Sequence, residues 1–230
     1  GLAYPYLLRG LAQVAGTQAA RGRVILAQLG NGASLAAVRG GQCVDTSMGF
    51  TPCGGLPMGT RSGDLDPGVV AHMMQSEGLT AIQFRDMINH ESGLLGISER
   101  SADMRDLIAA ETTDIPAAEA VELFCYQVKK WIGSYVAILN GLDTLVFAGG
   151  IGENAPTVRA GICAGLEFLG IELDNSRNAG NANVISAKTG RVAVHVMHTD
   201  EELMIATLVC RVLGLPMFNG EEQGYSYDEE

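Results

Sequence analysis

The stretch VILAQLGNGASLAAVRGGQCVDTSM, residues 24–48, decides the fold class of this chain. It contains three short strand candidates, VILAQLG, ASLAAVRG and QCVDTSM. Asn31-Gly32 separates the first segment from the second, and Gly40-Gly41 separates the second from the third. Asn-Gly and Gly-Gly are favoured in tight hairpin turns because these residues tolerate a positive φ. The stretch therefore predicts a three-stranded antiparallel meander.

Helices and parallel strands are predicted after the meander. Residues 116–140 place apolar side chains at i, i+3 and i+4, as in a helix with one buried face, and Trp131 lies on that face as a core or interface residue. TLVFA, residues 144–148, is the continuous apolar run of a buried parallel strand. Residues 191–198 give a further strand, and a helix follows each of the two. This order predicts an α/β fold of the ribonuclease-H-like type, which actin-like ATPases and sugar kinases use in pairs.

The chain is expected to divide into three parts. Residues 1–20 carry the apolar spacing of a leading helix, which the turn-like TQAARGR follows. Residues 21–203 contain the meander and the parallel strands and are expected to form the ribonuclease-H-like domain. Residues 204–230 are expected to form a C-terminal helix and the acidic tail EEQGYSYDEE. Because the first residue is Gly1 and not Met, the chain is interpreted as part of a longer protein.

Composition and charge exclude several classes of partner. The formal net charge of −11 argues against unspecific binding to nucleic acid or to anionic membranes. No apolar run is long enough to span a bilayer. Because the chain is acidic overall, any phosphate that it binds must be held locally, by backbone amides and a few cations. The 5 cysteines include no CxxC pair, which indicates reduced thiols in a cytoplasmic protein, and the 4 histidines lack the spacing of a zinc site.

Three glycine-rich turns follow predicted strands, at the sheet edge where open α/β folds bind ligands. LGNG, residues 29–32, is either a plain hairpin turn or a phosphate cradle of backbone N–H groups. GGIGEN, residues 149–154, is predicted to be a loop between a buried strand and a helix N-terminus, where anions bind. LPMGTRSGDLDPG, residues 56–68, places Arg61 among small residues. Arg61 either faces water or binds a phosphoryl group through its planar, permanently charged guanidinium.

Carboxylates near these turns are candidate metal ligands. Asp66 precedes a proline and is most simply a helix N-cap, and both Asp64 and Asp66 are also candidates for a metal. In TDEELMIA, Thr199 and Glu202 have the spacing of a capping box, which accounts for Glu202. Glu201 has no such function. It is therefore free to hold Mg²⁺ directly or through water.

The motifs together resemble those of the acetate kinase family. The matching stretches, in family order, are LGNGASLAAVRGGQCVDTSMGFTPCGGLPMGTRSGDLDPG, SGLLGIS, SADMRDL, VFAGGIGENAPTVR and TDEELMIA, and they span the chain from about residue 1 to residue 213. Five motifs in one register are highly specific. Without the resemblance, the charged turn at residues 102–106 would be read most simply as a solvated cluster.

The resemblance implies a kinase that moves a phosphoryl group between ATP and acetate, with Mg²⁺ as its cofactor, and that assembles as a homodimer. It also implies that this chain is the C-terminal half. In the family an N-terminal domain precedes it, with an Asn-Ala-Gly-Ser phosphate motif, a substrate-facing arginine, and a Phe-His-Gly motif whose glycine matches Gly1. By position, Arg61 resembles the transition-state arginine and Glu201 the Mg²⁺ ligand. The nucleotide-binding positions are a phosphate loop (Gln28, Leu29, Gly30, Asn31 and Gly32), an adenosine-contacting turn (Asp103, Met104 and Arg105) and a closing loop (Gly150, Ile151, Gly152, Glu153 and Asn154).

Gln28 departs from the family, in which histidine is usual at this position. Glutamine donates a hydrogen bond but cannot carry a positive charge. Two further hypotheses stand beside acetate kinase. The isolated chain is a non-catalytic nucleotide-binding or dimerising module, because the N-terminal motifs are absent from it. Alternatively the substrate is propionate or butyrate, because the family builds the carboxylate pocket largely from the other half.

Overall fold

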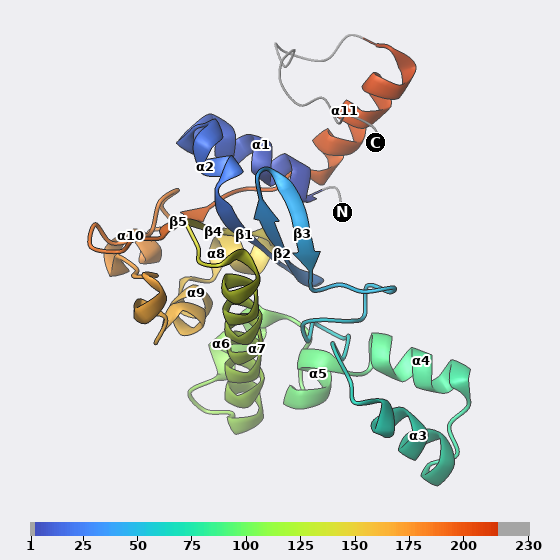
Figure 1. The fold of residues 1–230 in the computed structure, drawn as a ribbon. Helices are drawn as coiled ribbons and strands as arrows, with labels where there is room; N and C mark the ends of the chain where they lie inside the picture. The colour runs from blue at the N-terminus through green and yellow to red at the C-terminus, as the bar shows by residue number, and fades with distance from the viewer. Residues whose placement is uncertain (1–2, 216–230) are drawn as a thin grey trace.

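A five-stranded mixed sheet forms the centre of the computed structural model, which describes residues 3–215 (Figure 1). The strand order is β3-β2-β1-β4-β5. β1 (Arg23–Leu29), β2 (Ala33–Arg39) and β3 (Gln42–Thr46) pair antiparallel, as the predicted meander. β4 (Thr144–Ala148) pairs parallel with β1, and β5 (Ala193–Val196) pairs parallel with β4. Both parts of the predicted sheet are therefore present.

The two hairpin turns of the meander differ in their backbone conformation. Gly40 and Gly41 have φ values of 67° and 83°, as a two-residue turn between β2 and β3 requires. The β1–β2 turn instead has three residues, because Leu29 pairs with Ala33. Its Gly30 N–H donates to the Gly32 carbonyl at 3.1 Å, and neither Asn31 nor Gly32 has a positive φ. The predicted hairpin therefore forms at this Asn-Gly pair without using the positive φ that these residues tolerate.

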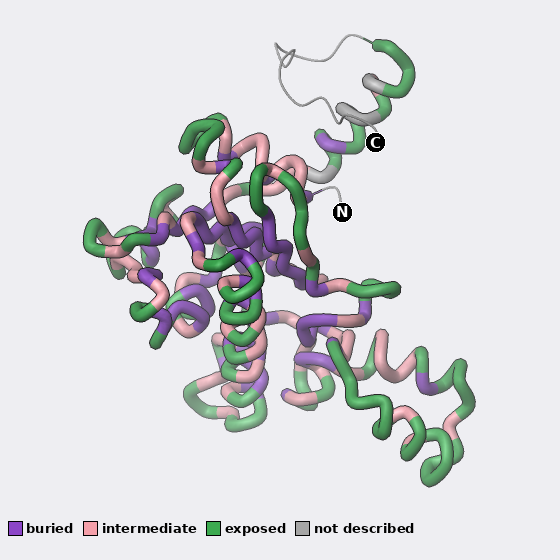
Figure 2. The backbone as a smooth tube through the Cα atoms, in the orientation of Figure 1, coloured by how far each residue is buried: buried purple, intermediate pink, exposed green. Residues whose placement is uncertain are grey.

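Helices cover both faces of the sheet. On one face, α1 (Ala3–Ala15) and α2 (Thr17–Arg21) bury Leu7 and Leu11 against strand residues that include Val24 and Leu26. On the other face lie the long α7 (Ile115–Leu139) and α9 (Pro156–Cys163), with α5 (Gly93–Ser98) and α6 (Met104–Ala110). Figure 2 shows the sheet as largely buried, except for its edge strand β3, which is mostly exposed. The remaining short elements are α8 (Gly149–Asn154), a 3-10 turn at Glu167–Leu169 and α10 (Asn175–Ala179).

The long helix α7 is bounded by residues of known capping type. Asp114 accepts a hydrogen bond from the Ala117 N–H at 3.3 Å, and Asn140 ends the helix in the left-handed conformation with φ 57°. Its buried stripe includes Phe124 and Tyr135. Trp131 is half-buried and packs edge-on against Tyr135, with ring centroids 5.4 Å apart. The predicted helix over residues 116–140 is confirmed to within one residue at each end.

α3 (Pro67–Ser76) and α4 (Ala81–His90) lie away from the sheet, and α3 has no buried residue (Figure 1). Asp66 caps α3 by accepting from the Gly68 N–H at 2.6 Å, as predicted. Thr80 caps α4 in a capping box with Gln83. Among residues 3–215, no helix combines the length and apolarity that crossing a membrane requires.

Two expectations at the chain ends need correction. The turn-like TQAARGR forms α2, and Gly16, with φ 88°, separates it from α1, so the leading segment is two helices rather than one. α11 (Glu201–Leu213) begins before the expected boundary at residue 204. This is because Asp200, whose carboxylate accepts from the Leu203 N–H at 2.8 Å, caps the helix. The acidic tail and Gly1 lie outside the described residues.

Arg23 and Asp143 join the start of β1 to the turn before β4. The Asp143 carboxylate accepts from the Arg23 Nε at 3.0 Å and from the Arg23 backbone N–H at 2.8 Å, and its other oxygen pairs with Nη2. The side-chain hydrogen bond from Arg23 is the main cause that lowers the pKa of Asp143. A lowered native pKa contributes stability above the ordinary carboxyl value of about 3.9, and this stability is lost as the pH falls through the native value.

We therefore expect Asp143→Asn to lower the free energy of unfolding more at pH 7 than at pH 3. The two side chains are 38% and 44% exposed, so solvent weakens the pair, and the expected loss at pH 7 is about 0.5–1 kcal/mol. Urea denaturation at both pH values measures the difference. An equal loss at pH 7 and pH 3 would show that the charge of Asp143 does not contribute.

Candidate active site

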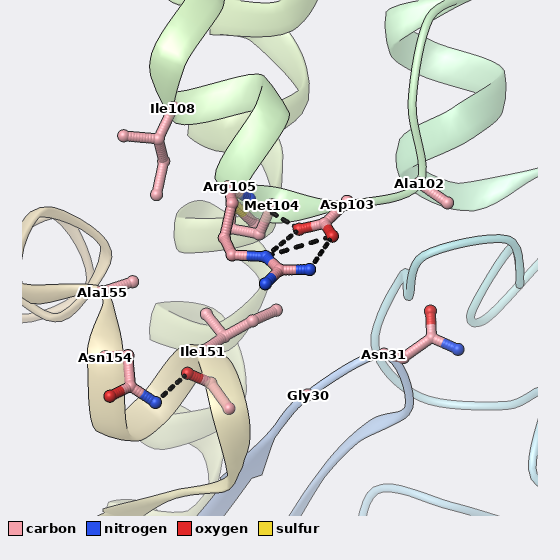
Figure 3. A pocket seen from close by; sticks show the side chains of 11 residues that line it. Gly30, Asn31, Ala102, Asp103, Met104, Arg105, Ile108, Ile151, Asn154 and Ala155 are labelled. Atoms are coloured by element: carbon pink, nitrogen blue, oxygen red, sulfur yellow. Dashed lines mark hydrogen bonds and ion pairs between the residues drawn. The ribbon is translucent and has the colours of Figure 1, made fainter.

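A cavity of about 770 Å³ opens at the carboxyl ends of β1 and β4 (Figure 3). Three segments that are distant in sequence meet there: the β1–β2 turn, the start of α6, and α8. Parallel strands present their carboxyl ends at one edge, which is where open α/β sheets bind ligands. The lining residues are Gly30, Asn31, Ala102, Asp103, Met104, Arg105, Ile108, Gly150, Ile151, Asn154 and Ala155.

Most of the predicted nucleotide-binding positions line this cavity, and some do not. Gly30, Asn31, Asp103, Met104, Arg105, Gly150, Ile151 and Asn154 are brought together, whereas Gln28, Leu29, Gly32, Gly152 and Glu153 do not line it. Sequence reasoning missed Ala102, Ile108 and Ala155, which extend the apolar wall. Ile108 lies one helical turn beyond Met104 on α6, so the i, i+4 spacing was the signal that could have found it.

The β1–β2 turn and α8 are in close contact because of a glycine. Gly149 has φ 77°, and a Cβ atom there would lie 2.6 Å from the Leu29 carbonyl oxygen. A Cβ atom on Gly30 would lie 3.9 Å from the Gly150 nitrogen. No other L-residue fits at position 149 without displacing the turn. Gly149 therefore allows two walls of the cavity to approach each other.

GGIGEN forms the short helix α8 rather than the predicted loop. After the left-handed turn at Gly149, the Ala155 N–H bonds to the Ile151 carbonyl at 3.0 Å, and Asn154 Nδ2 bonds to the Gly150 carbonyl at 3.1 Å (Figure 3). Gly152 is buried against Phe147 of β4. The helix thus presents Gly150, Ile151 and Asn154 to the cavity and Gly152 to the sheet.

Glu153 bonds to groups of the protein and does not line the cavity. Its Oε1 accepts from the Gly149 N–H at 3.0 Å and from the Thr199 N–H at 3.4 Å, and its Oε2 bonds to His198 Nδ1 at 2.8 Å. The hydrogen bond with Glu153 is the main cause that raises the pKa of His198. Glu153 therefore ties α8 to the segment between β5 and α11.

Gln28 also bonds to the segment between β5 and α11. Its Nε2 donates to Thr199 Oγ1 at 3.3 Å, and its Oε1 is buried with no partner among residues 3–215. Thr199 does not form the predicted capping box with Glu202, because Asp200 caps α11 instead. The expectation for Thr199 was wrong because the neighbouring aspartate takes the capping position.

Arg61 lies beside the β1–β2 turn. The Gly59 N–H bonds to the Asn31 carbonyl at 3.2 Å, and a Cβ atom on Gly32 would lie 3.4 Å from Arg61 Nη1. Nη1 donates to the Pro52 carbonyl at 3.2 Å and contacts Met58 Sδ at 3.5 Å. Among the side chains that the structure describes, which do not include Glu201, no carboxylate pairs with this guanidinium. It therefore keeps donors for an anion next to a glycine-rich turn.

Asp64 and Asp66 bond to backbone N–H groups. Asp64 Oδ1 accepts from the Gly55 N–H at 2.7 Å, and Asp66 caps α3. Glu201 is the first residue of α11, five residues after Val196, the last residue of β5. No group of three or more His, Cys, Asp or Glu side chains that could hold a metal occurs in the described part of the chain. Mg²⁺ in nucleotide sites usually keeps several waters and phosphate oxygens as ligands and takes only one or two carboxylates from the protein.

Asp103 and Arg105 form an ion pair at the rim of the cavity (Figure 3). Asp103 caps α6 by accepting from the Arg105 N–H at 2.9 Å, and Arg105 Nε donates to the same carboxylate at 3.0 Å. The side-chain hydrogen bond from Arg105 lowers the pKa of Asp103 to about 2. Ile151 faces Arg105, and Ile108 lies further along the wall (Figure 3). The cavity therefore combines apolar walls with a charged rim, as small-molecule sites commonly do.

Comparisons with known proteins give the family. Residues 1–207 match the model of the acetokinase family. An acetate kinase of Methylocella silvestris is 50% identical over 206 residues, which are 90% of this chain and 50% of that protein. A propionate kinase of Citrobacter rodentium is 47% identical over 213 residues, 92% of this chain and 53% of that protein.

A solved structure confirms the fold class. The crystal structure of Porphyromonas gingivalis acetate kinase matches with a TM-score of 0.88 and 41% identity, over 93% of this chain and 54% of that one. The chain spans about half the length of the curated relatives it matches. This chain belongs to the acetokinase family.

Proposed function

We propose that this chain is the C-terminal, nucleotide-binding half of an acetate kinase, which transfers a phosphoryl group reversibly between ATP and acetate to give acetyl phosphate and ADP. The cavity of about 770 Å³ carries the proposal. The β1–β2 turn, the Asp103–Arg105 turn and α8 surround it. Arg61 lies beside Gly32 of the β1–β2 turn.

Each wall has a proposed role in nucleotide binding. Asp103, Met104, Arg105 and Ile108 surround the adenosine, because they supply the apolar wall and the charged rim. The turn over residues 28–32 lies along the phosphates, with backbone N–H groups as donors. Gly150, Ile151 and Asn154 form the opposite wall, and Glu153 acts on it through its bonds to the β5–α11 segment.

Phosphoryl transfer asks the protein mainly for positioning and charge neutralisation. In the proposed reaction a carboxylate oxygen attacks the γ-phosphorus in line. Arg61 donates hydrogen bonds to the equatorial oxygens, where negative charge is spread in the transition state. Glu201 would hold Mg²⁺, directly or through water. When bound, this ion would neutralise charge on the phosphates.

The N-terminal half is proposed to supply the carboxylate pocket and the remaining phosphate contacts. This accounts for the chain matching only about half of each relative. The assembled enzyme is proposed to be a cytoplasmic homodimer. A propionate or butyrate substrate is the second candidate, because one relative at 47% identity is named a propionate kinase.

ADP binding to the 230-residue chain tests the proposal. We expect isothermal titration to show binding of ADP at one site, with no turnover of acetyl phosphate by the chain alone. Adding the N-terminal half is expected to restore turnover. Rates with acetate, propionate and butyrate then identify the substrate.

Two outcomes would contradict the proposal. Absence of ADP binding, both alone and with the N-terminal half, would remove the nucleotide site. ADP binding without turnover in the presence of the N-terminal half would favour a non-catalytic nucleotide-binding module instead.

A further inference from the structure

Arg159 of α9 is a fully buried charge without a carboxylate partner. Its side chain has a relative exposure of 0%, which places it among the largest fully buried side chains of the described chain. None of the ion pairs within residues 3–215 involves it. An arginine remains protonated in proteins, so the charge persists. A buried charge of this kind is strongly destabilising unless hydrogen bonds compensate it.

Oxygen atoms from two parts of the chain provide this compensation. The guanidinium has five N–H donors. Nη1 donates to the carbonyls of Gly152 and Glu153 at 2.8 and 2.9 Å. Nε and Nη2 donate to Asn178 Oδ1 and O at 2.8 and 2.7 Å, and Nη2 also donates to Asn181 Oδ1 at 2.6 Å. All five donors therefore have an acceptor. We call Arg159, Asn178 and Asn181 the Arg159 network.

The network joins the C-terminal end of α8 to the end of α10. Gly152 and Glu153 are among the last residues of α8, where helix carbonyls lack partners within the helix and carry partial negative charge. Asn178 also donates through Nδ2 to the carbonyl of Pro156, the first residue of α9, at 2.9 Å. The positive charge of Arg159 thus lies where the end of the helix favours a cation.

α8 depends on such support because it is short. It has six residues, fewer than a helix needs to be stable by itself. Gly150, Ile151 and Asn154 line the cavity from this helix, whereas Arg159 does not (Figure 3). The network and the cavity therefore contact α8 through different residues.

We propose that Arg159 is a positioning residue that holds α8 in the conformation required for nucleotide binding, through the Gly152 and Glu153 carbonyls. The proposal rests on the proposed function of the cavity. It assigns Arg159 no contact with substrate. Its effect on binding passes through the backbone of α8.

Arg159→Lys tests this role while keeping the charge. An ammonium group has three donors on a flexible stem and cannot reproduce the planar five-donor arrangement. We expect hydrogen exchange of the α8 amides, measured on the nucleotide-free chain, to become at least about tenfold faster, as loss of one hydrogen bond to a charged group implies. We expect the Kd for ADP to rise by a similar factor.

Asn181→Gly is the matched control. It removes one acceptor of the same guanidinium on the α10 side, leaves both bonds to α8, and suits the φ of 49° at this position. It is expected to leave α8 exchange and the Kd for ADP within about twofold of the parent, since one acceptor of five is lost on the far side of α8. A purely structural role of Arg159 would instead make both variants lose global stability with no selective change in α8.

Asn178→Ala is the second variant, for the case in which Arg159→Lys does not fold. It removes the acceptor of Nε and the bond to Pro156 but keeps the guanidinium, and we expect a smaller selective increase of α8 exchange. Unchanged α8 exchange in the variants that fold overturns the proposal, whatever happens to ADP. If the parent chain binds no ADP but α8 exchange rises as expected, the proposed function fails while the effect of Arg159 on α8 stands.

Discussion

Arg61→Ala is expected to lower kcat by about 10³, the scale on which arginine fingers act in phosphoryl transfer. The measurement uses a protein that joins this chain to the proposed N-terminal half. Arg61 donates to the Pro52 carbonyl at 3.2 Å and pairs with no carboxylate among the described side chains, so its remaining donors are available to a phosphoryl group. Since the interaction strengthens as charge spreads in the transition state, kcat is expected to change more than the KM for ATP.

Two substitutions control for charge and for position. Arg61→Lys keeps the charge without the planar fork, and we expect a kcat between those of the parent and of Arg61→Ala. Arg85→Ala removes an arginine of α4 that pairs only with its neighbour Asp86 among the described residues, and we expect it to leave kcat unchanged. Near-normal turnover by the Arg61→Ala enzyme would contradict the assignment of Arg61 as the transition-state arginine.

Gly93→Ala is expected to lower the free energy of unfolding by about 3 kcal/mol, the sum of a left-handed conformation costing about 1–2 kcal/mol and overpacking costing about 1–3 kcal/mol. Gly93 is buried at the start of α5 with φ 61°. A Cβ atom there would overlap the Met58 carbonyl and lie 2.5 Å from the Arg61 carbonyl oxygen. The Leu94 N–H bonds to that same Met58 carbonyl at 2.8 Å, so relieving the overlap also disturbs the turn that carries Arg61.

Gly133→Ala is the matched control for Gly93→Ala. Gly133 lies within α7 and is exposed, and a Cβ atom there would meet no described atom within 4 Å outside the local helix backbone. Alanine is therefore expected to stabilise the protein by about 0.5–1 kcal/mol, because glycine is unfavourable inside a helix. Urea denaturation of both variants measures the opposite signs. A Gly93→Ala protein as stable as the parent would mean that the α5 turn adapts without strain.

The sheet could be predicted from the sequence because its signals are local. Gly40-Gly41 marks a two-residue turn by itself, and the apolar run at residues 144–148 identifies a strand buried on both faces. The N-cap Asp66 was predicted for the same reason, since it bonds to a residue two positions later. Bonding partners that are this close in sequence can be predicted from a local pattern.

The candidate site could be predicted only in part, because its remaining features depend on distant residues. Glu153 bonds to Thr199, 46 residues away, and nothing in GGIGEN indicates that partner. Arg159 reads as a surface arginine on a short helix until Asn178 and Asn181 are placed beside it. α8 was predicted as a loop because its glycines disfavour a helix, and contacts with β1 and β4 outweigh that preference.

The parallel pairing of β1 with β4 has a consequence for the order of folding. Arg23 and Asp143, which join these strands, are 120 residues apart in sequence, whereas the hairpins of the meander need only short turns. Closing a long loop costs more entropy than closing a short one, and non-local contacts form slowly. During synthesis the meander leaves the ribosome long before β4 exists. We therefore expect the proposed nucleotide site to be among the last parts of the fold to form. A nascent chain stalled before residue 144 is expected to contain the strands of the meander but not this site.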